Sequence, residues 1–155
     1  MILYFLRHAE AESYAASDFE RQLTAKGIEQ ATKVGKFCLR QGLEPDVILT
    51  SPVIRAKRTA EIVGKAMDLE PTIEDWLANG VAHRTLLRRL ASHKGCKALM
   101  LVGHEPDFSA CISALLGLPN SSAVRVQKAS LTAVDALGLE EGDGQLVFSI
   151  PVRLM

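Results

Sequence analysis

Two arginines and two histidines follow apolar runs in three separate parts of the sequence. Arg7 and His8 come directly after one run, Arg55 follows a second shortly after its end, and His104 follows a third. Guanidinium groups match the geometry of phosphate oxygens, and a neutral imidazole can act as a nucleophile or transfer a proton. If the four side chains converge, they form a pocket for a dianion, and a phosphoryl group is the obvious ligand.

The elements that must bring these residues together are short strands and the helices between them. Short apolar runs bounded by polar residues are typical of buried strands, and they span residues 1–6, 46–50 and 98–102. Thr24 is a suitable N-cap for a helix that Gly42 would end. Further helices are predicted over residues 53–67, 83–93 and 106–117, with a short strand over 70–73.

The last third of the chain has a different pattern. Residues 129–137 and 145–151 are strand-like, and the turn-forming segment 140–144 (EEGDG) separates them, which predicts an antiparallel hairpin. The alternation of strands and helices before it predicts right-handed β-α-β units. We therefore expect a single α/β domain over residues 1–155. It would be a three-layer α/β/α sandwich with a mostly parallel sheet and an antiparallel hairpin at its C-terminal edge.

This fold gives the separated residues one meeting place. Ligands of open α/β sheets bind beyond the carboxyl ends of the parallel strands, where Arg7, His8, Ser51, Arg55 and His104 would all lie. The N-termini of the following helices would point free N–H groups to the same place. The sequence contains neither G-x-x-x-x-G-K-[ST] nor G-x-G-x-x-G, so side chains would hold the phosphate. Neither a metal site nor a cofactor is predicted.

Bulk composition narrows the class of protein. Lys plus Arg equals Asp plus Glu at 18 each, which argues against nucleic acid as a partner. No apolar stretch is long enough to span a bilayer, and residues 1–6 are too short for a signal-peptide core. Three widely spaced cysteines, without a C-x-x-C, do not form a disulfide framework. A cytoplasmic protein without a membrane association is therefore predicted.

Three motifs resemble the signature segments of a known family. They are Arg7-His8-Ala9-Glu10, the segment 51–59 (SPVIRAKRT) and Gly103-His104, in this order and each at a predicted strand end. Together they are similar to the histidine phosphatase superfamily, which has the phosphoglycerate-mutase-like fold. The segment 18–27 (DFERQLTAKG) and the small size resemble, more narrowly, the SixA-type phosphohistidine phosphatases.

The resemblance implies a role for each core residue. His8 would be the nucleophile that becomes phosphorylated, Arg7 and Arg55 would hold the phosphoryl oxygens, and His104 would donate to the same oxygens. Two features depart from the family pattern. Ala9 stands where the family usually has glycine, and the chain is too short for the large insert that supplies a proton-donating carboxylic acid in longer members.

The chemistry sets its own requirements on His8. A histidine nucleophile must be neutral at the attacking nitrogen, and the ordinary pKa of histidine is about 6.5. Two flanking guanidinium groups are expected to lower the pKa of His8 and keep it neutral at pH 7. The other ring nitrogen would be fixed by a hydrogen bond, and a backbone carbonyl is the expected acceptor.

The proton donor for the leaving group stays open among four carboxyl groups: Asp18, Glu74, Asp75 and Glu105. Asp18 is favoured for a role in the pocket, together with Arg21. Glu105 follows His104 at a helix N-terminus and is the poorer donor, but it joins Ser51 among the expected substrate-binding residues. A phosphoramidate such as phosphohistidine is easier to expel than an alkoxide, so a strong acid is not required for it.

The predicted function is a metal-independent phosphatase that works through a phosphorylated His8. Its substrate would be phosphohistidine on a protein partner or a small phosphoester. Phosphomutase activity is disfavoured because the short chain offers little enclosure against water. The alternative from another class is a non-catalytic phosphate-binding module. Arg125 and Lys128 precede a late strand and would be able to reach a phosphoprotein. The sequence makes no prediction of the oligomeric state.

Overall fold

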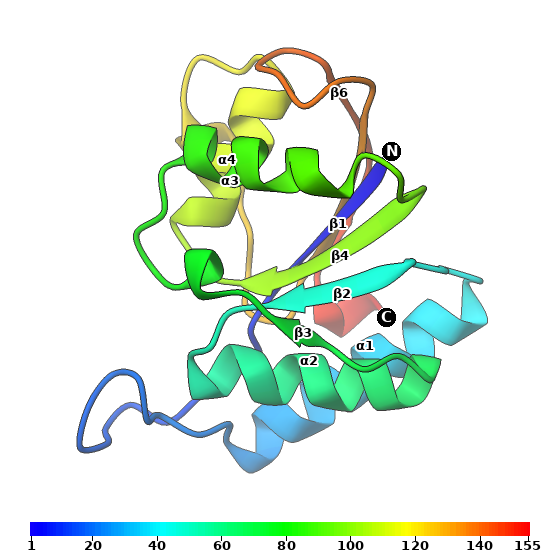
Figure 1. Cartoon of the computed structure of the whole chain (residues 1–155). Helices are drawn as coiled ribbons and strands as arrows, with labels where there is room; N and C mark the ends of the chain where they lie inside the picture. Colours follow the sequence, from blue (N-terminus) through cyan, green and yellow to red (C-terminus); the bar gives the residue numbers. More distant parts are fainter.

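The computed structural model describes residues 1–155 and contains one six-stranded sheet (Figure 1). The strand order is β3-β2-β4-β1-β5-β6, and the first four neighbours are parallel to one another. Each of the last two strands is antiparallel to its preceding neighbour. The strands are β1 (Ile2–Arg7), β2 (Val47–Thr50), β3 (Thr72–Ile73), β4 (Ala98–Gly103), β5 (Leu131–Ala136) and β6 (Gly144–Ile150).

Helices cover both faces of the sheet, as Figure 1 shows. One face carries α1 (Ala25–Arg40) and α2 (Ile54–Met67), and the other carries α3 (His83–Leu90) and α4 (Asp107–Leu115). The predicted three-layer sandwich is thereby confirmed. The hairpin is also confirmed. Of its two strands, only β6 lies at an edge of the sheet, because β5 pairs with β1 on its other side.

The central strand β1 serves two cores by alternation of its side chains. Tyr4 and Leu6 belong to the cluster under α1 and α2, whereas Leu3 and Phe5 belong to the cluster under α3 and α4. A strand that is buried on both faces reads as a continuous apolar run, which is why residues 1–6 show no polar alternation. This burial fixes the direction in which the end of β1 points.

The predicted helix boundaries were confirmed at some ends and wrong at others. Thr24 caps α1 by accepting a hydrogen bond from the Gly27 N–H at 3.0 Å, and Gly42 takes the left-handed φ of 62° beyond its end. The helix predicted over residues 83–93 ends at Leu90, because Ala91–His93 tightens into a 3-10 turn. None of the helices is both long and apolar enough to cross a membrane.

Candidate active site

Three neighbouring strands, β2, β4 and β1, end at the same level of the sheet. The His8 N–H donates to the Gly103 carbonyl at 3.0 Å, and the Ser51 N–H donates to the Val102 carbonyl at 3.0 Å. His104 directly follows the last residue of β4. The backbone of the central strand therefore sets the spacing between residues that are far apart in the sequence.

The two imidazoles face one another at this edge. Their ring centroids lie 5.3 Å apart with an interplanar angle of 53°. His8 is 5% exposed and His104 is 2% exposed, so both rings are nearly removed from solvent. The predicted convergence of the two histidines is thereby confirmed.

The hydrogen bonds of His8 define which nitrogen carries the proton. Its Nδ1 lies 2.8 Å from the Ala9 carbonyl, which can only accept, so Nδ1 is the protonated nitrogen. The neutral ring then has a lone pair on Nε2, where it accepts a hydrogen bond from Arg55 Nε at 3.3 Å. The expectation that a backbone carbonyl fixes the second nitrogen is confirmed.

The pKa of His8 is lowered to about 4, so the ring is neutral at pH 7. Burial is the largest cause, and the positive charges of Arg55, Arg7 and Lys128 add to it. The predicted lowering by the two guanidinium groups is confirmed, and burial, which the sequence does not predict, is a larger cause. The sequence does not show how completely the ends of β1 and β4 are covered, and this cover removes the solvation that an imidazolium needs.

Arg55 is 4% exposed and projects from the first turn of α2. Besides its contact with His8, its Nη1 donates to the Asp18 carbonyl at 2.7 Å, and its Nη2 donates to Asp18 Oδ2 at 3.0 Å. Thr59 on the next turn donates to the Arg55 carbonyl at 2.7 Å and accepts from the Ala9 N–H at 3.1 Å. Thr59 therefore joins the nucleophile loop to α2, a role that its sequence position does not reveal.

Asp18 lies on the loop that connects β1 with α1, and Arg21 lies on the same loop. Arg21 Nη1 donates to Asp18 Oδ1 at 2.8 Å, and this bond is the largest cause of the lowered pKa of Asp18, ahead of the bond from Arg55. A carboxylate held ionised by two guanidinium groups is a poor proton donor. Asp18 and Arg21 thus lie beside Arg55, and the structure disfavours Asp18 as the acid.

Arg7 is held in place by a segment that precedes β5. Its Nη1 donates to the Val126 carbonyl at 2.9 Å, and the Ala129 N–H donates to the carbonyls of Arg7 and His8 at 3.1 and 3.2 Å. Ala129 has a φ of 55°, a left-handed conformation that is uncommon for a residue with a side chain. Backbone groups make these contacts, so neither Val126 nor Ala129 could be identified from the sequence.

His104 contacts Ser51 at the end of β2. Its Nε2 lies 2.8 Å from Ser51 Oγ, and this oxygen also accepts a hydrogen bond from the Val53 N–H at 3.2 Å. The pKa of His104 is lowered to about 3, first by burial and then by His8 and Arg55. Ser51 is therefore a direct partner of the second histidine, and it is fully buried.

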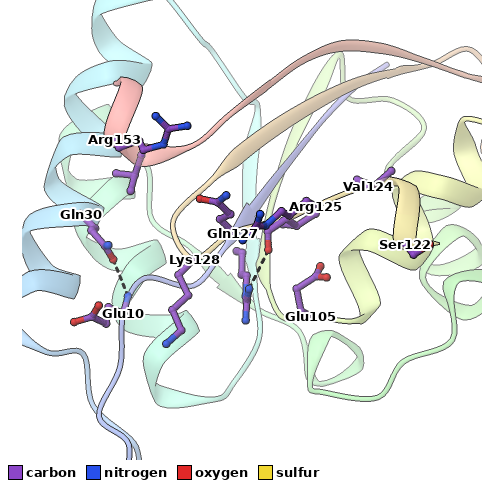
Figure 2. A pocket seen from close by; sticks show the side chains of 12 residues that line it. Glu10, Gln30, Glu105, Ser122, Val124, Arg125, Gln127, Lys128 and Arg153 are labelled. Atoms are coloured by element: carbon purple, nitrogen blue, oxygen red, sulfur yellow. Dashed lines mark hydrogen bonds between the residues drawn. The ribbon is translucent and has the colours of Figure 1, made fainter.

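A cleft of about 700 Å³ is lined by residues next in sequence to the two histidines, Arg7 before His8 and Glu105 after His104; Figure 2 shows its lining. Arg7 lines it and so joins it to the site, and its lining also includes Glu10, Glu105, Arg125, Lys128 and Arg153. Glu105, an expected substrate-binding residue, lines this cleft, and its Oε1 accepts a hydrogen bond from the Ser109 N–H at 2.9 Å. Glu74 and Asp75, the remaining candidates for the acid, do not line it.

Unpaired polar atoms are concentrated at the site. The buried side-chain atoms without a hydrogen-bond partner are Arg7 Nε, His104 Nδ1 and Ser113 Oγ, and two of these three belong to the residues described above. Native structures satisfy most buried polar atoms, and exceptions gather at functional sites. No group of three or more His, Cys, Asp or Glu side chains lies close enough together to hold a metal ion.

Comparison with known proteins agrees with this arrangement. Residues 3–80 match the profile of the "Histidine phosphatase superfamily (branch 1)". The chain is 34% identical over 132 residues to the phosphohistidine phosphatase SixA homolog of Haemophilus influenzae, covering 77% of this chain and 80% of that protein. The fold matches the protein histidine phosphatase SixA complexed with tungstate (TM-score 0.87, 23% identity, 99% of both chains). It also matches the alpha-ribazole phosphatase of Shigella flexneri (TM-score 0.81, 19% identity, 98% and 97% of the chains).

Proposed function

This chain belongs to the histidine phosphatase superfamily, and we propose that it is a phosphatase that transfers a phosphoryl group first to His8 and then to water. Its substrate is phosphohistidine on a partner protein. The observation that carries this proposal is the state of the His8 ring. Nδ1 donates to the Ala9 carbonyl, so the lone pair lies on Nε2 at the centre of the site, where an entering phosphoryl group replaces the 3.3 Å hydrogen bond from Arg55 Nε.

In the first step, His8 Nε2 attacks the phosphorus atom and forms a P–N bond. The bond between phosphorus and the substrate imidazole breaks, and that imidazole leaves with the electron pair and takes up a proton from water. Arg7 and Arg55 bind the phosphoryl oxygens and stabilise the charge that spreads over them in the transition state. The contact of Arg55 Nε with the nucleophilic nitrogen places this guanidinium beside the reacting phosphorus.

In the second step, water attacks the phosphorus of phosphorylated His8, and the new P–N bond breaks to release inorganic phosphate. His104 lies across from His8 and donates a hydrogen bond to the phosphoryl oxygens in both steps. Its partner Ser51 holds the ring in position. Covalent catalysis of this kind divides one difficult transfer into two easier ones.

The choice of phosphohistidine as substrate is supported by two facts. The relative from Haemophilus influenzae bears the name of a phosphohistidine phosphatase. Asp18, which was favoured for a place in the pocket, is paired with Arg21 and Arg55 and is a poor proton donor. A phosphoramidate needs less help from an acid than a phosphoester, so this site suits phosphohistidine.

We also propose that residues 1–155 act as a single histidine-phosphatase domain, because strands from both halves of the chain alternate in one sheet. Cys38, Cys96 and Cys111 are free thiols, which is usual in the reducing cytoplasm and supports the proposal of that location.

A paired assay tests the proposed function. The wild-type chain, His8→Ala and His93→Ala are each incubated with a phosphohistidine peptide and with an aryl phosphate, in the presence of EDTA. His93 lies in the turn after α3 and serves as the matched control. We expect His8→Ala to be inactive. In the wild-type protein, we expect a phosphoryl group on the proteolytic fragment that contains His8. Turnover that persists in His8→Ala would remove His8 as the nucleophile.

The same assay separates the alternatives. The alpha-ribazole phosphatase of Shigella flexneri shares the fold, so a small phosphoester remains the second candidate substrate. If small phosphoesters are turned over much faster than phosphohistidine, a small phosphoester is the favoured substrate. Binding of inorganic phosphate without turnover of any substrate would identify a non-catalytic phosphate-binding module.

A further inference from the structure

We infer that the cleft beside Arg7 selects substrates in which carboxylates flank the phosphorylated residue. This inference rests on the proposed function, because it names the part of a protein substrate that lies next to the transferred phosphoryl group. The cleft consists of the lining around Arg7 described above, and its volume of about 700 Å³ accommodates several side chains in addition to a phosphorylated one.

The positive charges of the cleft lack partners within the chain. Arg125, Lys128 and Arg153 are exposed, and none of them forms a salt bridge. Of the two carboxylates in the lining, Glu10 pairs with Lys26 Nζ at 2.9 Å, and the charge of Glu105 acts on Arg7. A ligand in the cleft therefore meets a surplus of unpaired cations.

The cleft adjoins the reacting atoms through its basic residues. Lys128 immediately precedes Ala129, whose N–H holds the carbonyls of Arg7 and His8. The positive charge of Lys128 is the smallest of the charges that lower the pKa of His8. In the view of Figure 2, the side chain of Lys128 lies between those of Glu10 and Glu105.

Arg125 and Arg153 extend this basic surface away from the nucleophile. Arg125 lies on the segment before β5, and Arg153 lies in the C-terminal 3-10 turn Val152–Leu154, which packs near α1 (Figure 2). Only three of the twelve lining residues are hydrophobic, so an apolar leaving group would gain little binding free energy from burial in this cleft. Carboxylates on either side of a phosphorylated residue match both the charge and the polarity of this surface.

The test compares two peptides that carry the same non-hydrolysable phosphohistidine analogue, one with flanking glutamates and one with flanking lysines. Binding is measured by fluorescence anisotropy to the wild-type chain, to Arg125→Glu/Arg153→Glu and to Arg88→Glu/Arg89→Glu. The last variant makes the same change in net charge on exposed residues of α3, outside the cleft. Lys128 is left unchanged because its charge acts on His8.

We expect the wild-type chain and the α3 variant to bind the acidic peptide about three- to tenfold more tightly, the size that a few exposed ion pairs produce. Arg125→Glu/Arg153→Glu should lose or invert this preference. Equal binding of the two peptides by the wild-type chain, or a preference unchanged in the cleft variant, would overturn the inference. The authentic phosphohistidine forms of both peptides are assayed for turnover in parallel. If the wild-type chain still binds the acidic peptide more tightly but shows no His8-dependent turnover, the proposed function is refuted and the inference about the cleft stands.

Discussion

The histidine pair and the cleft beside it differ in almost every physical respect. His8, Arg55 and His104 are at most 5% exposed, and each has a fixed partner within the chain. Three basic residues of the cleft, Arg125, Lys128 and Arg153, are exposed and lack salt bridges. The buried part is organised for one small anion in one orientation. The open part accepts ligands of varied shape and acts through charge, so the chemistry and the choice of substrate are separate in this molecule.

Arg55→Gln gives the largest effect expected from this comparison, because it removes a buried donor next to the nucleophilic nitrogen. We expect kcat/KM to fall by about 10²- to 10³-fold, the usual loss for one transition-state donor. Arg58→Gln, one turn away on the exposed face of α2, is the matched control and should change kcat/KM by less than about twofold. Similar losses of kcat/KM in both variants would show that the buried arginine contributes no more to catalysis than an exposed one.

The pH dependence of stability gives a second test of the buried part. Both histidines have pKa values below the ordinary 6.5 in the folded chain, about 4 for His8 and about 3 for His104. The unfolded chain therefore binds more protons once the pH falls below about 6.5. The free energy of unfolding should decrease from there toward pH 4, by up to about 1.4 kcal/mol per pH unit for each histidine.

Urea unfolding between pH 7.5 and pH 4.5 measures this slope. In His104→Asn, one of the two titrating rings is absent, so the curve should be shallower in this window. Curves of equal slope for the variant and the wild-type chain would mean that the His104 ring is not held neutral by burial.

Gly103→Ala tests how closely the buried part is packed. A Cβ at Gly103 would lie 2.8 Å from Cζ of Phe108, a buried ring that packs edge-to-face against Phe5. We expect a loss of about 1–3 kcal/mol in the free energy of unfolding, together with lower kcat, because His104 is the next residue. Gly95→Ala, where nothing lies within 4 Å, should do neither. A stable and fully active Gly103→Ala would contradict this account of the packing.

Asp18→Asn should have the smallest effect, because the Asp18 side chain is exposed. The amide oxygen can still accept from Arg55, while the negative charge that opposes a phosphoryl dianion is removed. We expect KM to fall by up to about fivefold with kcat unchanged. Glu20→Gln, on the same loop, is the control. A drop in kcat as large as that of Arg55→Gln would instead identify Asp18 as a participant in the chemistry.

Much of the fold could be predicted because two of its strands are buried on both faces and appear as uninterrupted apolar runs. Residues 1–6 and 98–102 are of this kind, and their ends carry Arg7, His8 and His104. The rule that parallel strands end at one edge then brought the site together. Boundaries were less predictable, as in the 3-10 turn after Leu90, since local hydrogen bonds there follow packing and not periodicity.

The parts of the site that the sequence did not predict depend on backbone groups and on distant contacts. The Val126 carbonyl that holds Arg7 carries no sequence signature, because every residue has a carbonyl. Thr59 lies one turn after Arg55, but its bond to the Ala9 N–H depends on how α2 packs, which its sequence position does not reveal. The burial of His8 also depends on tertiary packing, so the sequence predicts the effect of the two guanidinium groups on its pKa but not the larger effect of burial.

The placement of β1 between β4 and β5 has a consequence for how the protein is made. Residue 2 pairs with residues 98 and 135, so the first strand finds its neighbours only after most of the chain has emerged from the ribosome. Contacts this distant in sequence slow folding. His8 is translated long before Gly103 and Ala129, with which its backbone forms hydrogen bonds, so a nascent chain stalled before these residues cannot assemble the pocket. Synthesis beyond residue 129 is therefore a precondition for any chemistry at His8.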